Sequence, residues 1–235
     1  VDLFGQPAEY KSIIEICKNE KILLIADSAQ SFGANYKKKK VGTIADYTTT
    51  SFFPSKPLGC YGDGGAIFTN SQIKADKLKS LRSHGKGENK YDNIEIGLNS
   101  RLDTLQATIL IEKLKIFKKE INIRNNIAKN YYEGLNSLFE CPVIPNHCNS
   151  SWALYTIKTK KRDQLMNALK LKNIPSSIYY PKPLHKQLGY NKFPRLKNLK
   201  NSEFLSKTVL SIPLCPYLSK GNQEFIIQIM TEFSK

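Results

Sequence analysis

The chain has 235 residues, 40% of them hydrophobic, which is enough for a sizeable core in one large or two modest domains. Its 36 lysines and arginines against 20 acids give a net charge of +16, an excess that raises nucleic-acid binding as a hypothesis. The basic residues are scattered, however, and no recognised DNA- or RNA-binding signature is present. The only tight basic run, at 37–40, is more typical of a polar hairpin turn than of a binding patch. We therefore expect no nucleic-acid partner.

The cysteines and the apolar runs restrict the class of protein further. The five cysteines form no CxxC pair and are odd in number, which indicates a reducing compartment without a disulfide framework or a structural zinc site. No apolar run approaches the roughly eighteen residues that a membrane-spanning helix needs. We therefore expect a cytoplasmic location, no membrane partner and no metal site.

The first half of the chain predicts strands and helices in alternation. An unbroken apolar run before Asp27 is typical of a central parallel strand that is covered on both faces. Strand, helix and strand in this order imply an α/β fold with a mainly parallel sheet and flanking helices. The expected elements are a helix over 9–18, strands over 22–26, 47–50 and 64–69, and a helix from its N-cap Ser71 towards His84.

The second half predicts a long helix and then a smaller domain. Helical spacing of apolar residues begins at Arg101, where Ser100 and Asp103 offer a capping pair, and continues through one long or broken helix until prolines end the pattern. The elements that follow suit a small α/β domain, and we expect a division into residues 1–125 and 126–235. These elements are strands over 152–157 and 178–180 and helices over 162–172 and 223–233.

Asp27 and Lys56 are candidates for chemistry because of where the expected strands place them. In open α/β sheets ligands bind at the carboxyl ends of the strands, where Asp27 lies, although an acid there also commonly caps the next turn. Lys56 follows the strand at 47–50 in a loop punctuated by proline and glycine, at the rim of the core, whereas most lysines lie on solvated faces. An acid and a lysine so placed fit pyridoxal 5′-phosphate (PLP), which needs an amine for a Schiff base and a carboxylate that keeps its ring nitrogen protonated.

Five segments form an ordered set along nearly the whole chain. They are VDLFGQPA (1–8), DSAQSFG (27–33), SFFPSK (51–56), GDGGA (62–66) and GLNSRLDTLQA (97–107). Through them the chain resembles the DegT/DnrJ/EryC1/StrS sugar aminotransferases, PLP enzymes that act on nucleotide-linked keto-sugars. The resemblance implies the α/β fold of fold type I, with a mainly parallel large domain, incomplete here, and a small C-terminal α/β domain.

The resemblance implies a role for each matched residue around the cofactor. Lys56 matches the Schiff-base lysine of the family, and Asp27 matches the partner of the pyridinium nitrogen. Ser51 matches a hydroxyl that binds the cofactor phosphate, with a strand serine bonded to the backbone as the alternative. Gln30 matches a side chain near the ring hydroxyl, with a surface amide as the alternative, and Ala29 matches a residue that packs on the ring face.

One further match implies a dimer. Asn99 matches an asparagine that reaches the cofactor phosphate of the neighbouring subunit, so the resemblance implies a homodimer with shared active sites. The alternative is an ordinary turn residue before the helix.

The resemblance also implies a transamination in two halves. An amino acid, expected to be glutamate, gives its nitrogen to the cofactor, and a nucleotide-linked keto-sugar then takes it for surface polysaccharide or O-antigen synthesis. In both halves the freed Lys56 amine acts as general base and acid. A related branch of the family carries histidine at this position and dehydrates its substrates, so Lys56 favours transamination. The alternatives are a catalytically degenerate relative that acts as a PLP-binding scaffold or regulator and, less favoured, a basic nucleic-acid-binding domain.

A motif in the second half bears on the sugar. Residues 179–187, YYPKPLHKQ, resemble the tail motif of the branch that aminates UDP-linked 2-acetamido-3-keto-hexuronic acids. This implies that Tyr180 and His185 contact the sugar or the PLP-bound substrate, although a histidine is more often structural in such a loop. Arg101 is the candidate for holding the uronic carboxylate, because a guanidinium can donate two parallel hydrogen bonds to it. The alternative is an arginine paired with an acid on its own helix.

The resemblance finally implies that this chain is part of a longer protein. It begins at Val1, and in the family the first matched segment lies well inside the large domain, so we expect about a hundred preceding residues, a domain-sized piece. The family's upstream Gly-Thr segment, which binds phosphate, and the aromatic that stacks on the cofactor would lie there. We therefore expect residues 1–125 to be the C-terminal part of the PLP-binding domain and their cofactor pocket to be incomplete.

Overall fold

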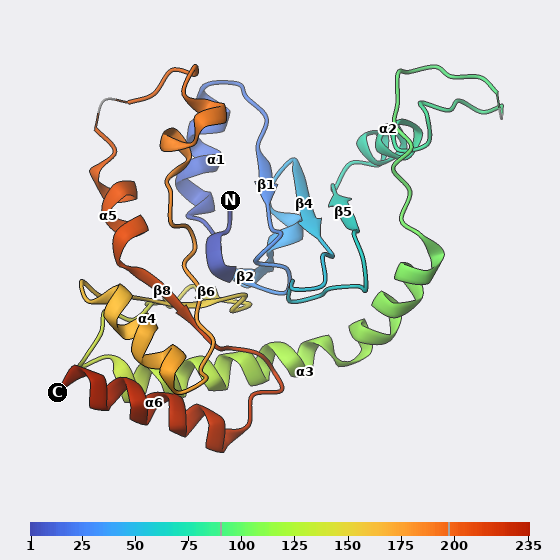
Figure 1. The fold of residues 1–235 in the computed structure, drawn as a ribbon. Coiled ribbons are helices and arrows are strands. Elements are labelled where there is room, and N and C mark those ends of the chain that lie inside the picture. Colours follow the sequence, from blue (N-terminus) through green and yellow to red (C-terminus); the bar gives the residue numbers. More distant parts are fainter. Residues whose placement is uncertain (90, 197) are drawn as a thin grey trace. The chain divides into compact units, whose positions relative to one another are not determined.

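The computed structural model describes residues 1–89, 91–196 and 198–235 (Figure 1). They form two compact units: unit 1 comprises Val1–Asn122 and Ile144–Ala153, and unit 2 comprises Ile123–Val143 and Leu154–Lys235. The helix α3 (Thr104–Leu135) contributes its first part to unit 1 and its last part to unit 2. It is a single unbroken helix, which settles the choice that the sequence left open.

The sheet of unit 1 has three strands in the order β1 (Ile25–Asp27), β4 (Tyr47–Ser51) and β5 (Gly65–Phe68) (Figure 1). The predicted α/β class is confirmed, and β1 runs parallel to β4 as expected. However, β5 runs antiparallel to β4. The reason is the connection between them, because residues 52–64 contain no crossover helix of the kind that usually joins parallel neighbours.

The two faces of this sheet differ in cover. Ala26 points to the buried face, where it packs in a cluster with Tyr10 of α1 (Tyr10–Asn19). On the other face, Ile25 is 65% exposed and Ile67 is 50% exposed. The expectation that β1 is covered on both faces is therefore wrong for the described residues, because Ile25 remains largely exposed on this face.

The basic run at 37–40 forms the hairpin turn that its composition predicts. β2 (Asn35–Tyr36) and β3 (Lys39–Lys40) pair antiparallel across Lys37 and Lys38, whose φ angles are 46° and 68°. Two-residue hairpin turns favour this left-handed backbone. The strand β6 (Cys148–Asn149) pairs with β2 and completes a second small sheet within unit 1.

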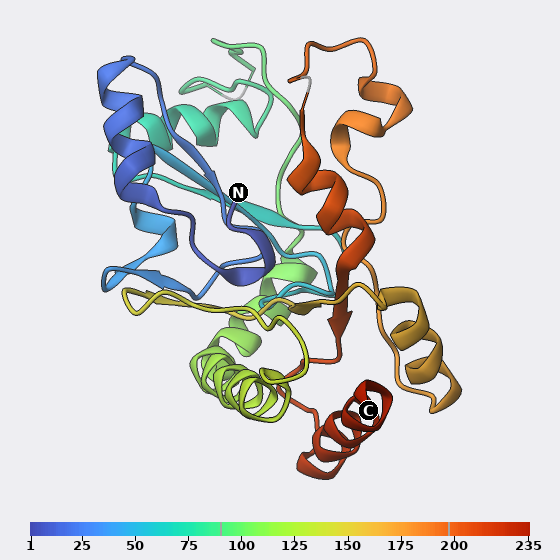
Figure 2. The ribbon, with the colours of Figure 1, turned by 90° about the vertical axis from the view of Figure 1, so that its left-hand side faces the viewer.

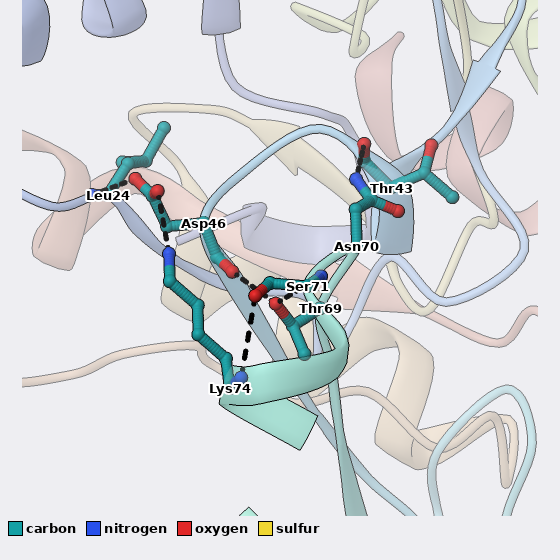
Figure 3. Close-up of polar contacts among 7 residues, drawn as sticks. All are labelled: Leu24, Thr43, Asp46, Thr69, Asn70, Ser71 and Lys74. Atoms are coloured by element: carbon teal, nitrogen blue, oxygen red, sulfur yellow. Dashed lines mark hydrogen bonds and ion pairs between the residues drawn. The ribbon is translucent and has the colours of Figure 1, made fainter. Parts of the chain in front are cut away.

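Helix α2 (Gln72–Leu81) begins at the predicted N-cap, because Ser71 Oγ accepts a hydrogen bond from Lys74 N at 3.4 Å. The same region closes the amino end of β4 (Figure 3). There Asp46 accepts hydrogen bonds from Leu24 N at 3.0 Å and from Lys74 Nζ at 3.1 Å, and its carbonyl accepts one from Thr69 Oγ1 at 3.0 Å. The Leu24 amide first, and Lys74 second, hold the pKa of Asp46 below its usual range.

Unit 2 is built on a two-stranded sheet. β7 (Tyr155–Lys158) pairs antiparallel with β8 (Val209–Ile212), and α4 (Arg162–Leu171) packs along α6 (Lys220–Ser234) (Figure 2). The helices predicted over 162–172 and 223–233 are confirmed. The fully buried side chains of this core are Tyr131, Leu135, Tyr155, Ile157, Leu165, Leu169, Leu210 and Met230.

The strand predicted over 178–180 is wrong. Ser177 makes only an isolated bridge with Ser211 of β8, and residues 178–180 do not extend it into a strand. The partner of β7 is β8, which the sequence pattern did not reveal. Helix α5 (Lys200–Thr208) was also not predicted and leads directly into β8.

Within the described residues, no helix has the length and apolarity to cross a membrane. The other elements found in the described ranges are 3-10 helices: η1 (Leu3–Gly5), η2 (Val41–Thr43), η3 (Leu184–Lys186) and η4 (Leu188–Tyr190).

Candidate functional site

The carboxyl ends of β1 and β4 bring two predicted site residues to one edge of the sheet. The strands are parallel and Asp27 of β1 is opposite Thr49 of β4. Ser51 is two residues beyond Thr49, at the carboxyl end of β4. Because side chains alternate along a strand, Asp27, Thr49 and Ser51 all belong to the face that also carries the exposed Ile25. A carboxylate and a hydroxyl therefore share the open face of the sheet.

Asp27 both caps the following turn and keeps part of its carboxylate available. Its Oδ1 accepts a hydrogen bond from Ala29 N at 3.0 Å, which is the capping contact that the sequence offered as the alternative. Among the residues described, Oδ2 has no hydrogen-bond partner. Since a carboxylate can accept at both oxygens, the capping contact leaves Asp27 able to bind a protonated ring nitrogen as well.

Gln30 lies just beyond this turn and is anchored to the N-terminal segment. Its Oε1 accepts a hydrogen bond from Phe4 N at 2.5 Å, and its carbonyl accepts one from Ser151 Oγ at 2.7 Å. Gln30 and its neighbour Ala29 are both half-buried, so Gln30 is not a simple surface amide. The segment after β1 is thus fixed from two directions.

A buried acid that the sequence reasoning did not single out holds the same segment. Asp2 is 1% exposed and accepts hydrogen bonds from Tyr10 Oη at 2.8 and 2.9 Å, from Ser31 Oγ at 2.6 Å and from Ala8 N at 2.8 Å. Its own amide donates to the carbonyl of Asp27 at 3.0 Å. Burial, and then the neighbouring Asp2 carboxylate, raise the pKa of Tyr10. The only signal in the sequence was an acid within the matched segment 1–8.

Lys56 lies in the loop that leaves β4 at Ser51. The Lys56 amide donates to the carbonyl of Phe53 at 2.9 Å, and Ser51 Oγ accepts from Phe53 N at 3.2 Å, so the two candidates lie in consecutive turns that meet at Phe53. The Lys56 side chain is half-buried and forms no ion pair among the described residues. A lysine amine without an ion-pair partner at the edge of the core is accessible to an aldehyde and can attack it once deprotonated.

Helix α3 supports this loop from behind, through residues that the sequence did not indicate. Lys113 Nζ donates to the carbonyl of Gly59 at 2.5 Å, and Gln106 Oε1 accepts from Tyr61 N at 2.8 Å. A Cβ at Gly59 would lie 2.6 Å from the carbonyl oxygens of Phe53 and Pro54, so the turn requires glycine. The loop that carries Lys56 is therefore fixed at both ends.

Asn99 and Arg101 lie in the segment of unit 1 that leads into α3, and both are exposed. Asn99 forms an isolated antiparallel bridge with Ser83. Arg101 borders a cavity of ≈ 720 Å³ that Thr49 and Ile67 of the sheet also border. Arg101 forms no ion pair in the described part of the chain, so the alternative of an arginine paired on its own helix is not observed.

Tyr180 and His185 belong to unit 2, unlike the other candidates, which belong to unit 1. The Tyr180 side chain is exposed. His185 is largely enclosed, and its Nε2 lies 3.2 Å from Oε1 of Glu203 on α5. Glu203 was not singled out from the sequence.

Comparison with known proteins identifies what this geometry belongs to. The model of the DegT/DnrJ/EryC1/StrS aminotransferase family matches residues 1–231. A protein of Pseudomonas aeruginosa named UDP-2-acetamido-2-deoxy-3-oxo-D-glucuronate aminotransferase is 40% identical over 232 residues, which cover 98% of this chain and 64% of the relative. A dTDP-3-amino-3,4,6-trideoxy-alpha-D-glucose transaminase of Streptomyces venezuelae is 32% identical, over 100% of this chain and 62% of the relative.

Solved structures show the same fold. A DegT DnrJ EryC1 StrS aminotransferase from Brucella abortus superposes with a TM-score of 0.97 at 45% identity, over 99% of this chain and 63% of that chain. NtdA from Bacillus subtilis, solved with bound cofactor PMP, superposes with a TM-score of 0.88 at 28% identity, over 98% of this chain and 55% of that one. The predicted fold class, fold type I of the PLP-dependent enzymes, is confirmed. The chain spans about 64% of the length of the curated relatives it matches.

Proposed function

The chain belongs to the DegT/DnrJ/EryC1/StrS aminotransferase family, and from this membership we propose that it moves an amino group from an amino acid to a nucleotide-linked keto-sugar, with PLP as cofactor. The amino donor in this proposal is glutamate. The observation that carries it is the arrangement at the edge of the sheet, where the open oxygen of Asp27 and the hydroxyl of Ser51 share a face and the unpaired Lys56 follows in a braced loop.

The residues present fit PLP, and each supplies a separate part of its site. Asp27 would bind the ring nitrogen, Ser51 the phosphate, and Lys56 the aldehyde carbon, with Gln30 beside the ring hydroxyl and Ala29 against the ring face. When bound, PLP supplies an electron sink for the carbanion that forms at the substrate α-carbon. Since this chain covers 64% of the Pseudomonas aeruginosa relative, we propose that the pocket has further parts outside the given residues.

The residues of this chain then perform distinct tasks. Lys56, once free, moves a proton between the substrate α-carbon and C4′ of the cofactor, and so must be neutral when it accepts. Asp27 would accept a hydrogen bond from the ring nitrogen and so favour its protonated form, which is why the open oxygen matters. The hydrogen bonds of Asp2, Gln106 and Lys113 hold the two segments that carry these groups at fixed positions.

For the substrate we propose a UDP-linked 2-acetamido-3-keto-hexuronic acid, used in surface polysaccharide such as O-antigen. The support is the similarity to the Pseudomonas aeruginosa UDP-2-acetamido-2-deoxy-3-oxo-D-glucuronate aminotransferase and an exposed, unpaired Arg101 that can hold a carboxylate. Tyr180 and His185 would contact the sugar, and Asn99 would reach the cofactor phosphate of the second subunit in a cytoplasmic homodimer. We also propose that residues 1–125 belong to the PLP-binding domain and residues 126–235 to the small domain.

The test is covalent capture of the cofactor. The protein, expressed at the full length of its gene and incubated with PLP, should turn yellow, and borohydride should fix the cofactor to Lys56, as peptide mass spectrometry would locate. Added glutamate should bleach the colour and release 2-oxoglutarate. The Lys56→Ala variant should neither be fixed to the cofactor by borohydride nor release 2-oxoglutarate. The Lys39→Ala variant, changed in the exposed hairpin, should be fixed to the cofactor and should release 2-oxoglutarate. A protein that binds PLP without releasing 2-oxoglutarate would be a scaffold or regulator, and a colourless protein would overturn the proposal.

A further inference from the structure

Unit 2 contains a cavity whose lining is mostly basic. Its volume is ≈ 740 Å³, and it lies between the segment that follows Tyr180 and the start of α5. This size is within the range of small-molecule sites in proteins. The polar side chains that line it are Lys182, His185, Lys186, Arg195 and Glu203. Three cations against one carboxylate leave two positive charges uncompensated, with the histidine counted as neutral.

The single acid of this lining is already fully used. Glu203 Oε2 lies 2.7 Å from Lys186 Nζ, and Oε1 lies 3.2 Å from His185 Nε2. These contacts, with Lys186 as the larger cause and His185 second, lower the pKa of Glu203. Because a carboxylate only accepts hydrogen bonds, the Nε2 atom of His185 carries a proton in this arrangement. Glu203 therefore fixes one side of the cavity and holds His185 in one orientation.

The remaining two cations are free to bind a ligand. Arg195 donates one hydrogen bond, from Nη1 to the carbonyl of His185 at 2.9 Å, which anchors the guanidinium and leaves its other N–H groups unused. Among the described residues, neither Arg195 nor Lys182 forms an ion pair. Isolated surface cations are usually only solvated. Here, however, an anchored arginine and a lysine border one cavity, and the only acid there is bound to other partners.

We propose that this cavity binds the diphosphate of the nucleotide-linked sugar, with Arg195 and Lys182 as its ligands and Glu203 as the residue that positions His185 and Lys186. The inference rests on the proposed function and adds the subsite that takes the anionic part of the substrate. A guanidinium fork matches two phosphoryl oxygens, and a lysine contributes a mobile point charge beside it. The relatives named for UDP-linked and for dTDP-linked sugars share this diphosphate and differ in base and sugar.

The chain provides its own reporter for this site. It has three histidines, of which His185 lines the cavity while His84 and His147 belong to unit 1. In the protein expressed at the full length of its gene and labelled at histidine, His185→Gln would identify the imidazole signal of His185 by nuclear magnetic resonance. Titration with UDP or with inorganic pyrophosphate should shift the His185 signal in a saturable way. Uridine, which lacks phosphate, should leave it unchanged.

Two variants and one matched control separate a site from general attraction by a basic protein. Arg195→Gln should raise the Kd for UDP about tenfold or more, since a charge-assisted hydrogen bond is lost, and Lys182→Gln should raise it by a smaller factor. Lys192→Gln removes the same charge from the same segment, but Lys192 does not line the cavity and its Nζ lies 5.7 Å from the ring centre of Phe193. This control should bind UDP as the unmodified chain does.

Several results would overturn the proposal. They are a His185 signal that UDP does not move, a Lys192→Gln variant that weakens binding as much as Arg195→Gln, and saturation by D-glucuronate at lower concentration than by UDP. If Arg195→Gln also displaces the signals of His84 and His147, the fold has changed, and Lys182→Gln then decides the question, because the Lys182 side chain forms no hydrogen bond among the described residues. The experiment needs no PLP, so its failure would leave the cofactor capture at Lys56 standing, and failure of that capture would not alter the binding of UDP.

Discussion

The two ends of the β1–β4 pair each carry an aspartate and a lysine, and they differ in how far these groups are satisfied. At the amino end, Asp46 uses both carboxylate oxygens, one of them on Lys74, whose Nζ also lies 4.8 Å from the ring centre of Tyr47. At the carboxyl end, Asp27 uses one oxygen for the next turn, and Lys56 has no ion-pair partner in the described part of the chain. At the amino end, the closed end, the aspartate and the lysine bind each other. At the carboxyl end, the open end, the same two residue types remain able to bind a ligand.

The largest effect should come from replacing the lysine at each end in turn and comparing the variants. Lys56→Ala should lower aminotransferase activity at least about a thousandfold, because it removes both the nucleophile and the proton carrier, and it should leave the free energy of unfolding unchanged. Lys56→Arg should fail as well, since a guanidinium stays charged. Lys74→Ala should do the reverse, with activity kept and a small loss of stability. Glutamate half-reaction rates and urea denaturation of the three variants measure this, and equal behaviour of Lys56→Ala and Lys74→Ala would contradict the comparison.

The segment that carries Asp27 is held in place by hydrogen bonds to the buried Asp2, so replacement of Asp2 should affect stability strongly. Asp2→Ala would leave the hydroxyls of Tyr10 and Ser31 and the amide of Ala8 without their acceptor in a buried place, which should cost about 3 kcal/mol of unfolding free energy. Urea denaturation measures the loss. Glu15→Ala, an exposed acid on α1, is the control and should change stability by less than about 0.5 kcal/mol. A loss below about 1 kcal/mol for Asp2→Ala would show that these contacts are replaced by water.

The turn that carries Lys56 can be tested with a matched pair of glycines. Gly59→Ala places a Cβ 2.6 Å from two backbone carbonyl oxygens, so the loop must shift, at a cost of about 1–3 kcal/mol in stability and with a loss of activity. Gly221→Ala meets nothing within 4 Å and lies in α6, where alanine should stabilise by up to about 1 kcal/mol. Thermal unfolding and the half-reaction rate measure both. Retention of activity in Gly59→Ala would show that Lys56 does not depend on this turn.

The sequence predicted the parts of the site that local pattern encodes and missed those that depend on distant contacts. The apolar run before Asp27 and the punctuated loop around Lys56 are local, as is the hairpin turn at Lys37 and Lys38. The structure has a strand or a turn at each of these places, although β1 covers Ile25–Asp27 instead of the predicted 22–26. The support from Asp2 and Lys113 joins segments far apart in the chain, which no spacing rule indicates.

The strand errors have the same cause. Residues 178–180 are aromatic and β-branched and so resemble a strand, but β8, a short apolar run after a polar helix, pairs with β7 instead. Intrinsic β-propensity depends on the partner that is available. The direction of β5 likewise follows from its connection rather than from its own residues.

The smallest effect concerns the closed end and its dependence on pH. The folded-state pKa of Asp46 lies below its usual value of about 3.9, so in acid the unfolded chain binds more protons than the folded one. The contribution of Asp46 to stability is therefore complete above about pH 4 and is lost as the pH falls through the folded pKa. The carboxylate is 37% exposed and its partner Lys74 30% exposed, so solvent screening should keep this contribution below about 1 kcal/mol. Urea denaturation at several pH values should show a shallower acid slope for Asp46→Asn than for the unmodified chain, whereas an identical slope would mean that the closed end adds no electrostatic stability and differs from the open end in geometry alone.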